Sequence, residues 1–165
     1  MSALAMPAFD AIEATETLEQ VLSPTHDLWI EEARQLLLPD AAGEPVSWDR
    51  WSAIRYLNER LVERLRSERA MVQELRPFLT TREAITLEAG GERAGRLALA
   101  LDRLARRRGT TVAFGAIATE FLEALSVWCA EIELAARHVR FSKLPGDMQR
   151  KLEQLELGAG TTFGI

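Results

Sequence analysis

The spacing of the apolar residues most constrains the fold of this chain. Val, Ile, Tyr and Thr alternate with polar residues over no window of about five or more positions, so strand signals are almost absent. Leu, Ala, Glu and Arg dominate instead, and the apolar residues recur with helical spacing. The sequence therefore predicts an all-α protein, folded as an elongated bundle of about six helices.

Two of the predicted helices are long. Ser47 is a favourable N-cap, and the helical pattern after it continues to residue 76, where Pro77 prevents a further turn. This helix, over about residues 48–76, has a predicted length of roughly 44 Å. The second long helix covers 111–142 and forms a short-turn hairpin with a helix over 92–108.

The helix over 48–76 carries an apolar stripe that we expect to face the core. Glu68 interrupts this stripe, and Arg60, Glu63 and Arg64 are expected on other faces of the helix. The stripe consists of Ile54, Leu57, Leu61, Leu65, Val72 and Leu75.

Proline and glycine set other helix boundaries. Ser23 and Pro24 have the sequence of a cap and first helical position, which predicts one helix over about 9–22 and another from there to Leu38. A last helix is expected from Asp147 to just before Gly158.

The segment after Pro77 contains a start signal and a break signal. Thr80 and Glu83 have the spacing of a capping box, which predicts a helix N-terminus. Gly90 and Gly91 predict an interruption of that helix, because each glycine costs about 1 kcal/mol in a helix interior relative to alanine.

The length favours one domain, since chains usually divide only beyond roughly 250–300 residues and this one has 165. We expect a single all-α domain over 1–157, with acidic N-terminal helices over 1–46 and the main bundle over 47–157. A flexible Gly-rich tail is expected over 158–165.

The charges are distributed unevenly. The net charge of −5 includes −8 over residues 1–47 and +4 over residues 92–108, which predicts complementary faces within the fold or between subunits. Only Lys143 and Lys151 are lysines, and so high a share of arginine is typical of a GC-rich bacterial genome. The N-terminus lacks the basic and apolar segments of a signal peptide, so we expect a cytoplasmic protein.

Several chemistries are disfavoured by the residues present. The single cysteine, Cys129, can form neither an internal disulfide nor a zinc cluster, and its apolar neighbours predict a buried, unreactive thiol. Di-iron bundles place Glu three residues before His, whereas Ser23 precedes His26 and Ala135 precedes His138. We expect His26 near a helix N-terminus and His138 in a surface or interhelical hydrogen bond, and we predict neither metal nor cofactor.

Nucleic-acid and membrane binding are also disfavoured. Ala105 and Gly109 have the spacing of a helix-turn-helix, but the helix that follows would present mainly apolar and small side chains to the bases. The chain is acidic overall, which weakens attraction to phosphate. No run of about 18 apolar residues lacks a charge, so no membrane span is expected.

Carboxylates on the most apolar predicted helix form one candidate site. Glu120 and Glu123 lie three positions apart, and Glu131 shares a face with Glu120. A carboxylate on an inner face needs a partner or a raised pKa. Two alternatives are open, a structural ion-pair network with arginines or a general acid–base pair in a cleft. The candidate arginines are Arg55, Arg64, Arg96 and Arg103.

Aromatic side chains form a second candidate site. Trp48 and Trp51 lie three positions apart on one helix face, and Trp29 and Trp128 are expected to complete a cluster. This cluster is interpreted as core or, alternatively, as a ligand pocket or a hot spot for a partner helix. The candidate pocket or interaction residues are Trp48, Trp51, Trp128, Glu120, Glu123, Arg103, Arg106 and Arg107.

The sequence contains neither a nucleophile elbow nor a phosphate-binding glycine loop. We therefore expect a non-catalytic protein–protein interaction or scaffolding bundle that forms a homodimer, because such long helices exceed a compact globule of this size. The alternatives are a ligand-sensing bundle with an aromatic and carboxylate-lined pocket, and a carboxylate-based enzyme or metal protein.

Overall fold

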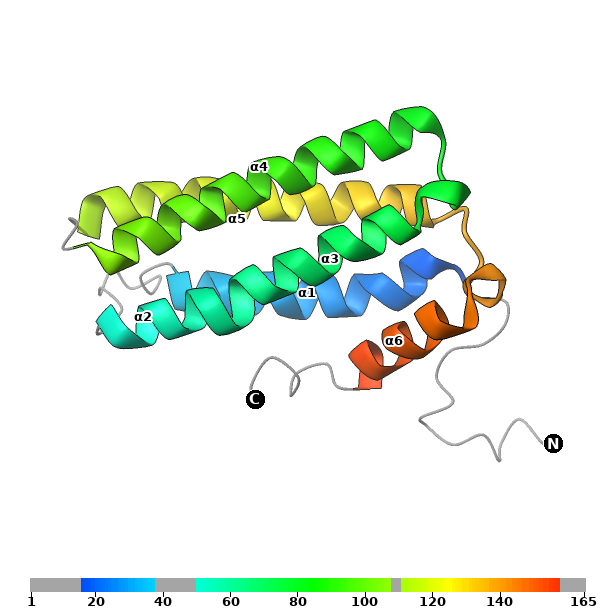
Figure 1. Cartoon of the computed structure of the whole chain (residues 1–165), viewed down its shortest axis with the longest axis horizontal. Coiled ribbons are helices and arrows are strands. Elements are labelled where there is room, and N and C mark those ends of the chain that lie inside the picture. The colour runs from blue at the N-terminus through cyan, green and yellow to red at the C-terminus, as the bar shows by residue number, and fades with distance from the viewer. Residues whose placement is uncertain (1–15, 38–49, 108–110, 158–165) are drawn as a thin grey trace. The chain divides into compact units, whose positions relative to one another are not determined.

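The computed structural model describes residues 16–37, 50–107 and 111–157, and these residues are almost entirely helical (Figure 1). Within them no strand occurs, and the only bridge joins Thr17 to Arg140. The predicted all-α class is therefore confirmed. The α-helices are α1 (Leu18–Leu37), α2 (Arg50–Tyr56), α3 (Glu63–Glu74), α4 (Thr81–Arg106), α5 (Thr111–Ala136) and α6 (Gly146–Leu157), with a π-helical turn η2 (Leu57–Val62) and two short 3₁₀ helices, η3 (Arg76–Phe78) and η4 (Phe141–Lys143).

The long helix predicted over 48–76 is present. α2, η2 and α3 follow one another without a gap and form one continuous helix over 50–74, so the described residues contain five separate helices where about six were predicted. All six predicted stripe residues are buried. Arg64 and Glu68 are buried beside them, so the prediction that Arg64 lies on another face is wrong.

The helix boundary predicted at Ser23 and Pro24 is also wrong, because α1 continues through Pro24 to Leu37. A proline inside a helix removes one backbone hydrogen bond and costs about 3 kcal/mol. The buried apolar face of α1 offsets this cost. Residues of this face are Leu18, Val21, Leu22, Trp29, Ala33 and Leu37. Residues 9–15 and Leu38 of the predicted helices lie outside the described residues.

The predicted break at Gly90 and Gly91 is not observed, because α4 runs without interruption from Thr81 to Arg106. The predicted capping box before it is confirmed. The Glu83 backbone N–H donates to Thr80 Oγ1 over 3.1 Å, and the Thr80 N–H donates to Glu83 Oε1 over 2.8 Å. Residues 108–110, which join α4 to α5, lie outside the described residues.

Residues 29–132 form one compact unit. Within it, α4 lies along the continuous helix α2–η2–α3 (Figure 1). Arg64 of α3 stacks over Trp29 of α1, and Trp128 of α5 packs against α4. These four helical segments therefore share one core. Its largest fully buried side chains are Trp29, Leu57, Leu61, Leu75, Leu87, Leu101, Phe121, Leu125, Trp128 and Ile132.

Residues 1–28 and 133–165 form the other unit, of which 16–28 and 133–157 are described. Here α5 ends at Ala136, earlier than the predicted residue 142. The reason is that the following backbone bonds to the start of α1: Leu18 N–H donates to Val139 O over 2.7 Å, and Phe141 N–H donates to Glu16 O over 2.9 Å. α6 begins one residue before the predicted Asp147. The tail over 158–165 lies outside the described residues, and the single domain over 1–157 stays a prediction.

Candidate functional site

One face of the continuous helix α2–η2–α3 carries four polar side chains at four-residue spacing, which we call the polar row. They are Tyr56, Arg60, Arg64 and Glu68. Tyr56, Arg64 and Glu68 are buried and Arg60 is half-buried. The row faces the part of α1 that carries Trp29 and Glu32. Since buried polar groups cost free energy unless they are paired, their presence in a small core requires an explanation.

The π-helical turn explains why the row stays on one face. In an α-helix, a step of four residues passes slightly beyond a full turn, so such a row drifts around the helix. A π-turn bonds residue i to residue i+5 and holds more residues, so the same step falls short of a full turn. η2 lies between Tyr56 and Glu63. It therefore corrects the drift and keeps both ends of the row directed at α1.

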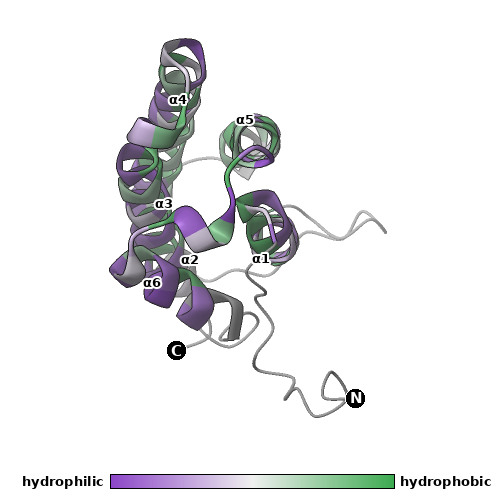
Figure 2. Ribbon diagram, turned by 90° about the vertical axis from the view of Figure 1, so that its right-hand side faces the viewer, coloured by the Kyte–Doolittle hydropathy of each residue, from purple (hydrophilic) through white to green (hydrophobic). Residues whose placement is uncertain are grey.

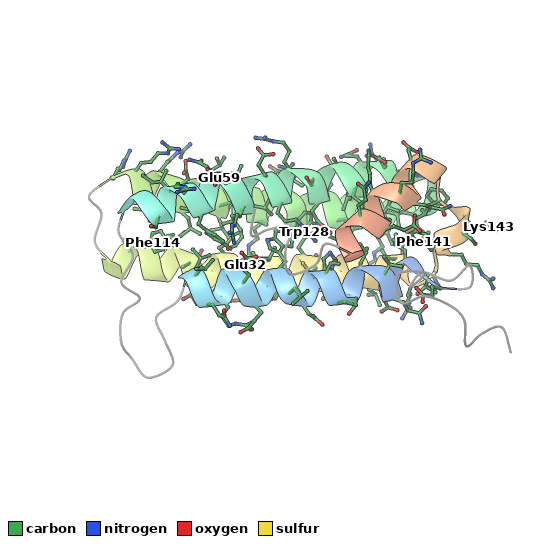
Figure 3. All side chains as sticks on the ribbon, turned by 90° about the horizontal axis from the view of Figure 1, so that it is seen from below. Glu32, Glu59, Phe114, Trp128, Phe141 and Lys143 are labelled. Atoms are coloured by element: carbon green, nitrogen blue, oxygen red, sulfur yellow. The ribbon has the colours of Figure 1, made fainter. Side chains whose placement is uncertain are left out.

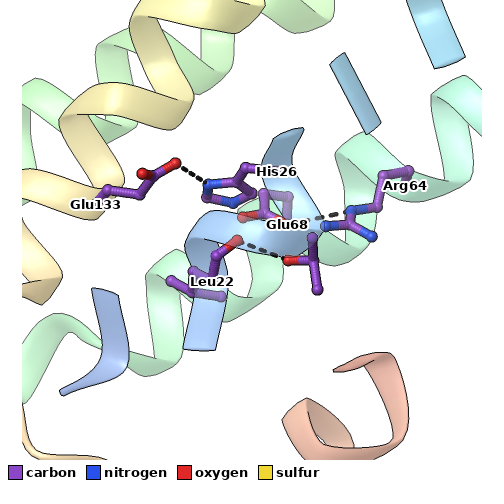
Figure 4. Close-up of polar contacts among 6 residues, drawn as sticks. Leu22, His26, Arg64, Glu68 and Glu133 are labelled. Atoms are coloured by element: carbon purple, nitrogen blue, oxygen red, sulfur yellow. Dashed lines mark hydrogen bonds and ion pairs between the residues drawn. The ribbon is translucent and has the colours of Figure 1, made fainter. Parts of the chain in front are cut away.

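Arg64 and Glu68 form the most deeply buried ion pair of the row. Arg64 Nε lies 3.3 Å from Glu68 Oε1, and both side chains are only 3% exposed (Figure 4). The Arg64 guanidinium carbon lies 4.8 Å from the centre of the Trp29 ring, a cation–π distance. Arginine is suited to this position because its planar group stacks and bonds at the same time.

At the other end of the row, Arg60 Nη1 donates to Glu32 Oε1 of α1 (Glu32 is labelled in Figure 3). Tyr56 lies beside this pair. Burial raises the pKa of the Tyr56 hydroxyl far above its ordinary value, and the Glu32 carboxylate raises it further, while Arg60 acts in the opposite direction. The Tyr56 hydroxyl therefore keeps its proton at neutral pH. The row places the charged groups of Arg60, Arg64 and Glu68 in or beside the core.

The free energy of unfolding is expected to fall as the pH rises above about 10. The ordinary pKa of tyrosine is 10.0 and that of folded Tyr56 is higher, so the unfolded chain loses this proton first. Stability contributed by the neutral hydroxyl is complete below this pH and is lost progressively above it. Tyr56 is the only tyrosine of the chain, so tyrosinate absorbance measures this group alone.

Two observations check this expectation. The folded protein should show no tyrosinate absorbance at the pH where a tyrosine peptide is half ionised, and urea unfolding of Tyr56→Phe should show a shallower decline in stability at alkaline pH. A tyrosinate signal with an ordinary midpoint in the folded protein would contradict it.

A buried histidine lies in the other unit. His26 is fully buried, and its Nδ1 shares a hydrogen bond with Glu133 Oε2 over 2.8 Å (Figure 4). The expectation that His26 lies near a helix N-terminus is wrong, because α1 starts at Leu18. His138 is exposed and its Nε2 accepts from Arg137 Nε over 3.2 Å, which confirms the predicted surface hydrogen bond.

Trp128 is held where α4 and α5 cross. Its indole N–H donates to the Leu87 carbonyl over 2.9 Å, and its ring lies against the glycine pair of α4. A Cβ at Gly90 would lie 2.6 Å from Trp128 Cδ1, and one at Gly91 would lie 2.9 Å from Trp128 Cζ2. Glu131 borders the same crossing, and burial raises the pKa of its carboxyl. The glycines therefore serve close packing rather than helix termination.

One face of α5 is exposed. α5 is nevertheless the most apolar helix, and its apolar character is seen in the hydropathy colouring of Figure 2. Apart from Thr119, the exposed positions in the described part of α5 follow alternating steps of four and three residues, and we call these six positions the α5 stripe. They are Ala116, Glu120, Glu123, Val127, Ala130 and Leu134. Val127 is 48% exposed and Leu134 is 55% exposed. In the described part of the chain, α5 is also the one helix long and apolar enough to cross a membrane, a property shared by core helices of soluble proteins.

The residues singled out from sequence are not brought together. Trp48 lies outside the described residues, and the side chain of Trp51 is not described. Trp128 is buried, whereas Glu120 and Glu123 lie on the exposed α5 stripe. Arg103, Arg106 and Arg107 are exposed near the end of α4, where Arg106 pairs with Asp102.

The predicted arginine partners bond within their own helices. Arg55, Arg64 and Arg96 pair with Glu59, Glu68 and Glu92, each four positions away. Within the described ranges, no ion pair joins the carboxylates of Glu120, Glu123 or Glu131 to an arginine. The acidic residues 1–47 were expected to complement the basic residues 92–108. Glu32 of α1 instead pairs with Arg60.

The sequence places Glu68 within the core-facing stripe but does not predict its pairing with Arg64, and it predicts neither the burial of His26 nor the exposure of Val127. Two sequence facts could have indicated a buried ion pair. Glu68 lies within the apolar stripe, and Arg64 lies four positions before it. The thiol of Cys129 is buried, as expected.

In the described residues no group of three His, Cys, Asp or Glu side chains lies close enough to hold a metal ion. Comparisons with protein-family models, curated proteins and solved structures gave no match to this chain.

Proposed function

We propose that the protein is a non-catalytic interaction or scaffolding protein that acts as a homodimer and binds through the α5 stripe. The observation that supports this is the exposure of Val127 and Leu134 on the most apolar helix. Alternating steps of four and three residues are the spacing by which one helix packs lengthwise on another. Such a face, which none of the described residues covers, is suited to a second helix.

The size of the side chains on the stripe is suited to helix pairing. Ala130 is small, so a second helix can approach closely between the larger Val127 and Leu134, and Ala116 is a second small residue near the other end of the stripe. The glutamates of the stripe are not a barrier, because long polar side chains commonly flank an apolar contact and remain solvated. From the sequence we expect a bacterial cytoplasmic protein. In that setting, copies of the chain would meet one another at high local concentration during synthesis.

The two alternatives have less support. A ligand pocket around Trp128 and Glu120 requires both to face one space, but Trp128 packs on α4 while Glu120 is exposed. A carboxylate enzyme requires paired acidic groups in a shielded site, whereas Glu120 and Glu123 are both exposed.

The test is the effect of Val127→Asp on the mass in solution. The wild type is expected to have twice the chain mass of 18.5 kDa. The variant is expected to raise the dimer dissociation constant about hundredfold or more, because it places an unpaired charge in a buried contact. Light scattering coupled to gel filtration measures both.

Ile85→Asp is the matched control, because Ile85 is a large apolar residue that is 61% exposed and belongs to α4, not to the α5 stripe. This variant is expected to remain dimeric. Equal masses for the two variants would contradict the assignment of the interface to α5.

A further inference from the structure

We propose that the two α5 helices of the dimer pair antiparallel, with Glu120 of each copy opposite Arg137 of the other. This inference rests on the proposed function. It is carried by the order of charges along α5, which is one continuous helix from Thr111 to Ala136. Glu120 and Glu123 lie in its N-terminal half, and Arg137 follows its last residue directly; all three are exposed.

The charge order distinguishes the two possible directions. In a parallel pair, Glu120 and Glu123 of one copy would face the same glutamates of the other, and like charges at an interface are unfavourable. In an antiparallel pair, the acidic half of each helix faces the C-terminal end of the other, where Arg137 lies. The same pairing repeats across the two-fold axis, so each dimer contains two oppositely charged contacts.

Spacing fixes the register within the antiparallel arrangement. If Val127 packs against Ala130 of the second copy, the same register places Glu123 opposite Leu134 and brings Glu120 to the C-terminal end of the second α5, which Arg137 directly follows. The small Ala130 accommodates the larger Val127 at the centre of the contact. The methylene groups of Glu123 can cover Leu134, while its carboxylate remains in water. From Ala116 to Leu134 this stripe extends about 27 Å along the helix.

The charged groups are available for this contact. In the described part of the chain Glu120 has no ion pair, and its pairing with a second copy would therefore break no existing bond. Arg137 Nε donates to His138. The two Nη nitrogens of the planar guanidinium carry further N–H donors, which point in other directions.

A charge-swap cycle on the full chain tests the inference. Glu120→Arg and Arg137→Glu are each expected to weaken the dimer about tenfold, because each change turns two favourable contacts into repulsive ones. The double variant is expected to restore the dissociation constant to within about twofold of the wild type. Sedimentation velocity at low salt measures all four proteins, and the losses should shrink in high salt.

Glu63→Arg serves as the control, because Glu63 is exposed on α3, away from the stripe, and should leave the dimer unchanged. A wild-type dimer whose double variant stays as weak as the single variants would overturn the antiparallel pairing but leave the proposed dimer intact. A wild type that is monomeric at every concentration would overturn both.

Discussion

Replacing Arg64 by Met is expected to lower the free energy of unfolding by about 3–5 kcal/mol. The change removes the guanidinium that lies 3.3 Å from the Glu68 carboxylate and over the Trp29 ring. Since Glu68 is itself 3% exposed, water cannot replace the lost charge without opening the core. Urea unfolding followed by circular dichroism at a fixed protein concentration measures the loss, because dimerisation makes stability depend on concentration.

Two further variants make this expectation specific to burial. Arg64→Met combined with Glu68→Leu is expected to recover most of the loss, because both charges of the buried pair are then replaced by apolar side chains. Arg66→Met is the matched control, since Arg66 pairs with Glu63 on the exposed side of the same helix and should cost less than about 1 kcal/mol. If Arg64→Met costs no more than Arg66→Met, the buried pair does not stabilise the fold.

Gly90→Ala is expected to destabilise the protein by about 1–3 kcal/mol, although alanine is the better helix former. The new Cβ would lie 2.6 Å from Trp128 Cδ1, so the ring must move. The hydrogen bond from the indole N–H to the Leu87 carbonyl of the same helix, α4, holds the ring close to Gly90 and opposes this movement. The loss is therefore one of packing, and it is measured by thermal or urea unfolding.

Gly115→Ala is the matched control within α5. A Cβ at Gly115 has no neighbouring atom within 4 Å, so only the gain in helix propensity remains. This variant is expected to stabilise the protein by about 0.5–1 kcal/mol. A loss of unfolding free energy for Gly90→Ala and a gain for Gly115→Ala would support close packing at Gly90. A gain for both variants would show that the glycine pair is not needed for contact with Trp128.

The features of the fold that depend on local sequence were predictable. Thr80 and Glu83 mark the start of α4 because both capping hydrogen bonds form within four residues. Pro77 ends the long helix for an equally local reason. The local cost of Pro24 and Gly90 predicts helix boundaries, but α1 and α4 continue through these residues. In both cases burial against another helix exceeds a local penalty of about 1–3 kcal/mol.

The polar row was not predictable, because its alignment depends on the π-turn over 57–62. In a regular α-helix Arg64 is expected on another face than the apolar stripe. The extra residues in the π-turn rotate the segment after it, so Arg64 and Glu68 both point at α1. Side-chain pairs such as His26 with Glu133 lie 107 positions apart, and a single sequence holds no signal for them.

The candidate surface was predicted only in part. Glu120 and Glu123 were singled out for their spacing, and they belong to the exposed stripe. Val127 and Leu134 were not singled out, because α5 carries apolar residues on nearly all of its sides. Which of these residues are exposed depends on which neighbouring helices cover α5. Sequence patterning identifies the one buried face of an amphipathic helix, but not the open face of a helix that is apolar all round.

The mass of the wild-type protein in solution tests the central claim most directly. Light scattering over a range of concentrations is expected to show the molar mass approach twice 18.5 kDa and rise no further, because an antiparallel pair closes on itself. A mass of 18.5 kDa that persists at the highest concentration would contradict the dimer and with it the role assigned to α5.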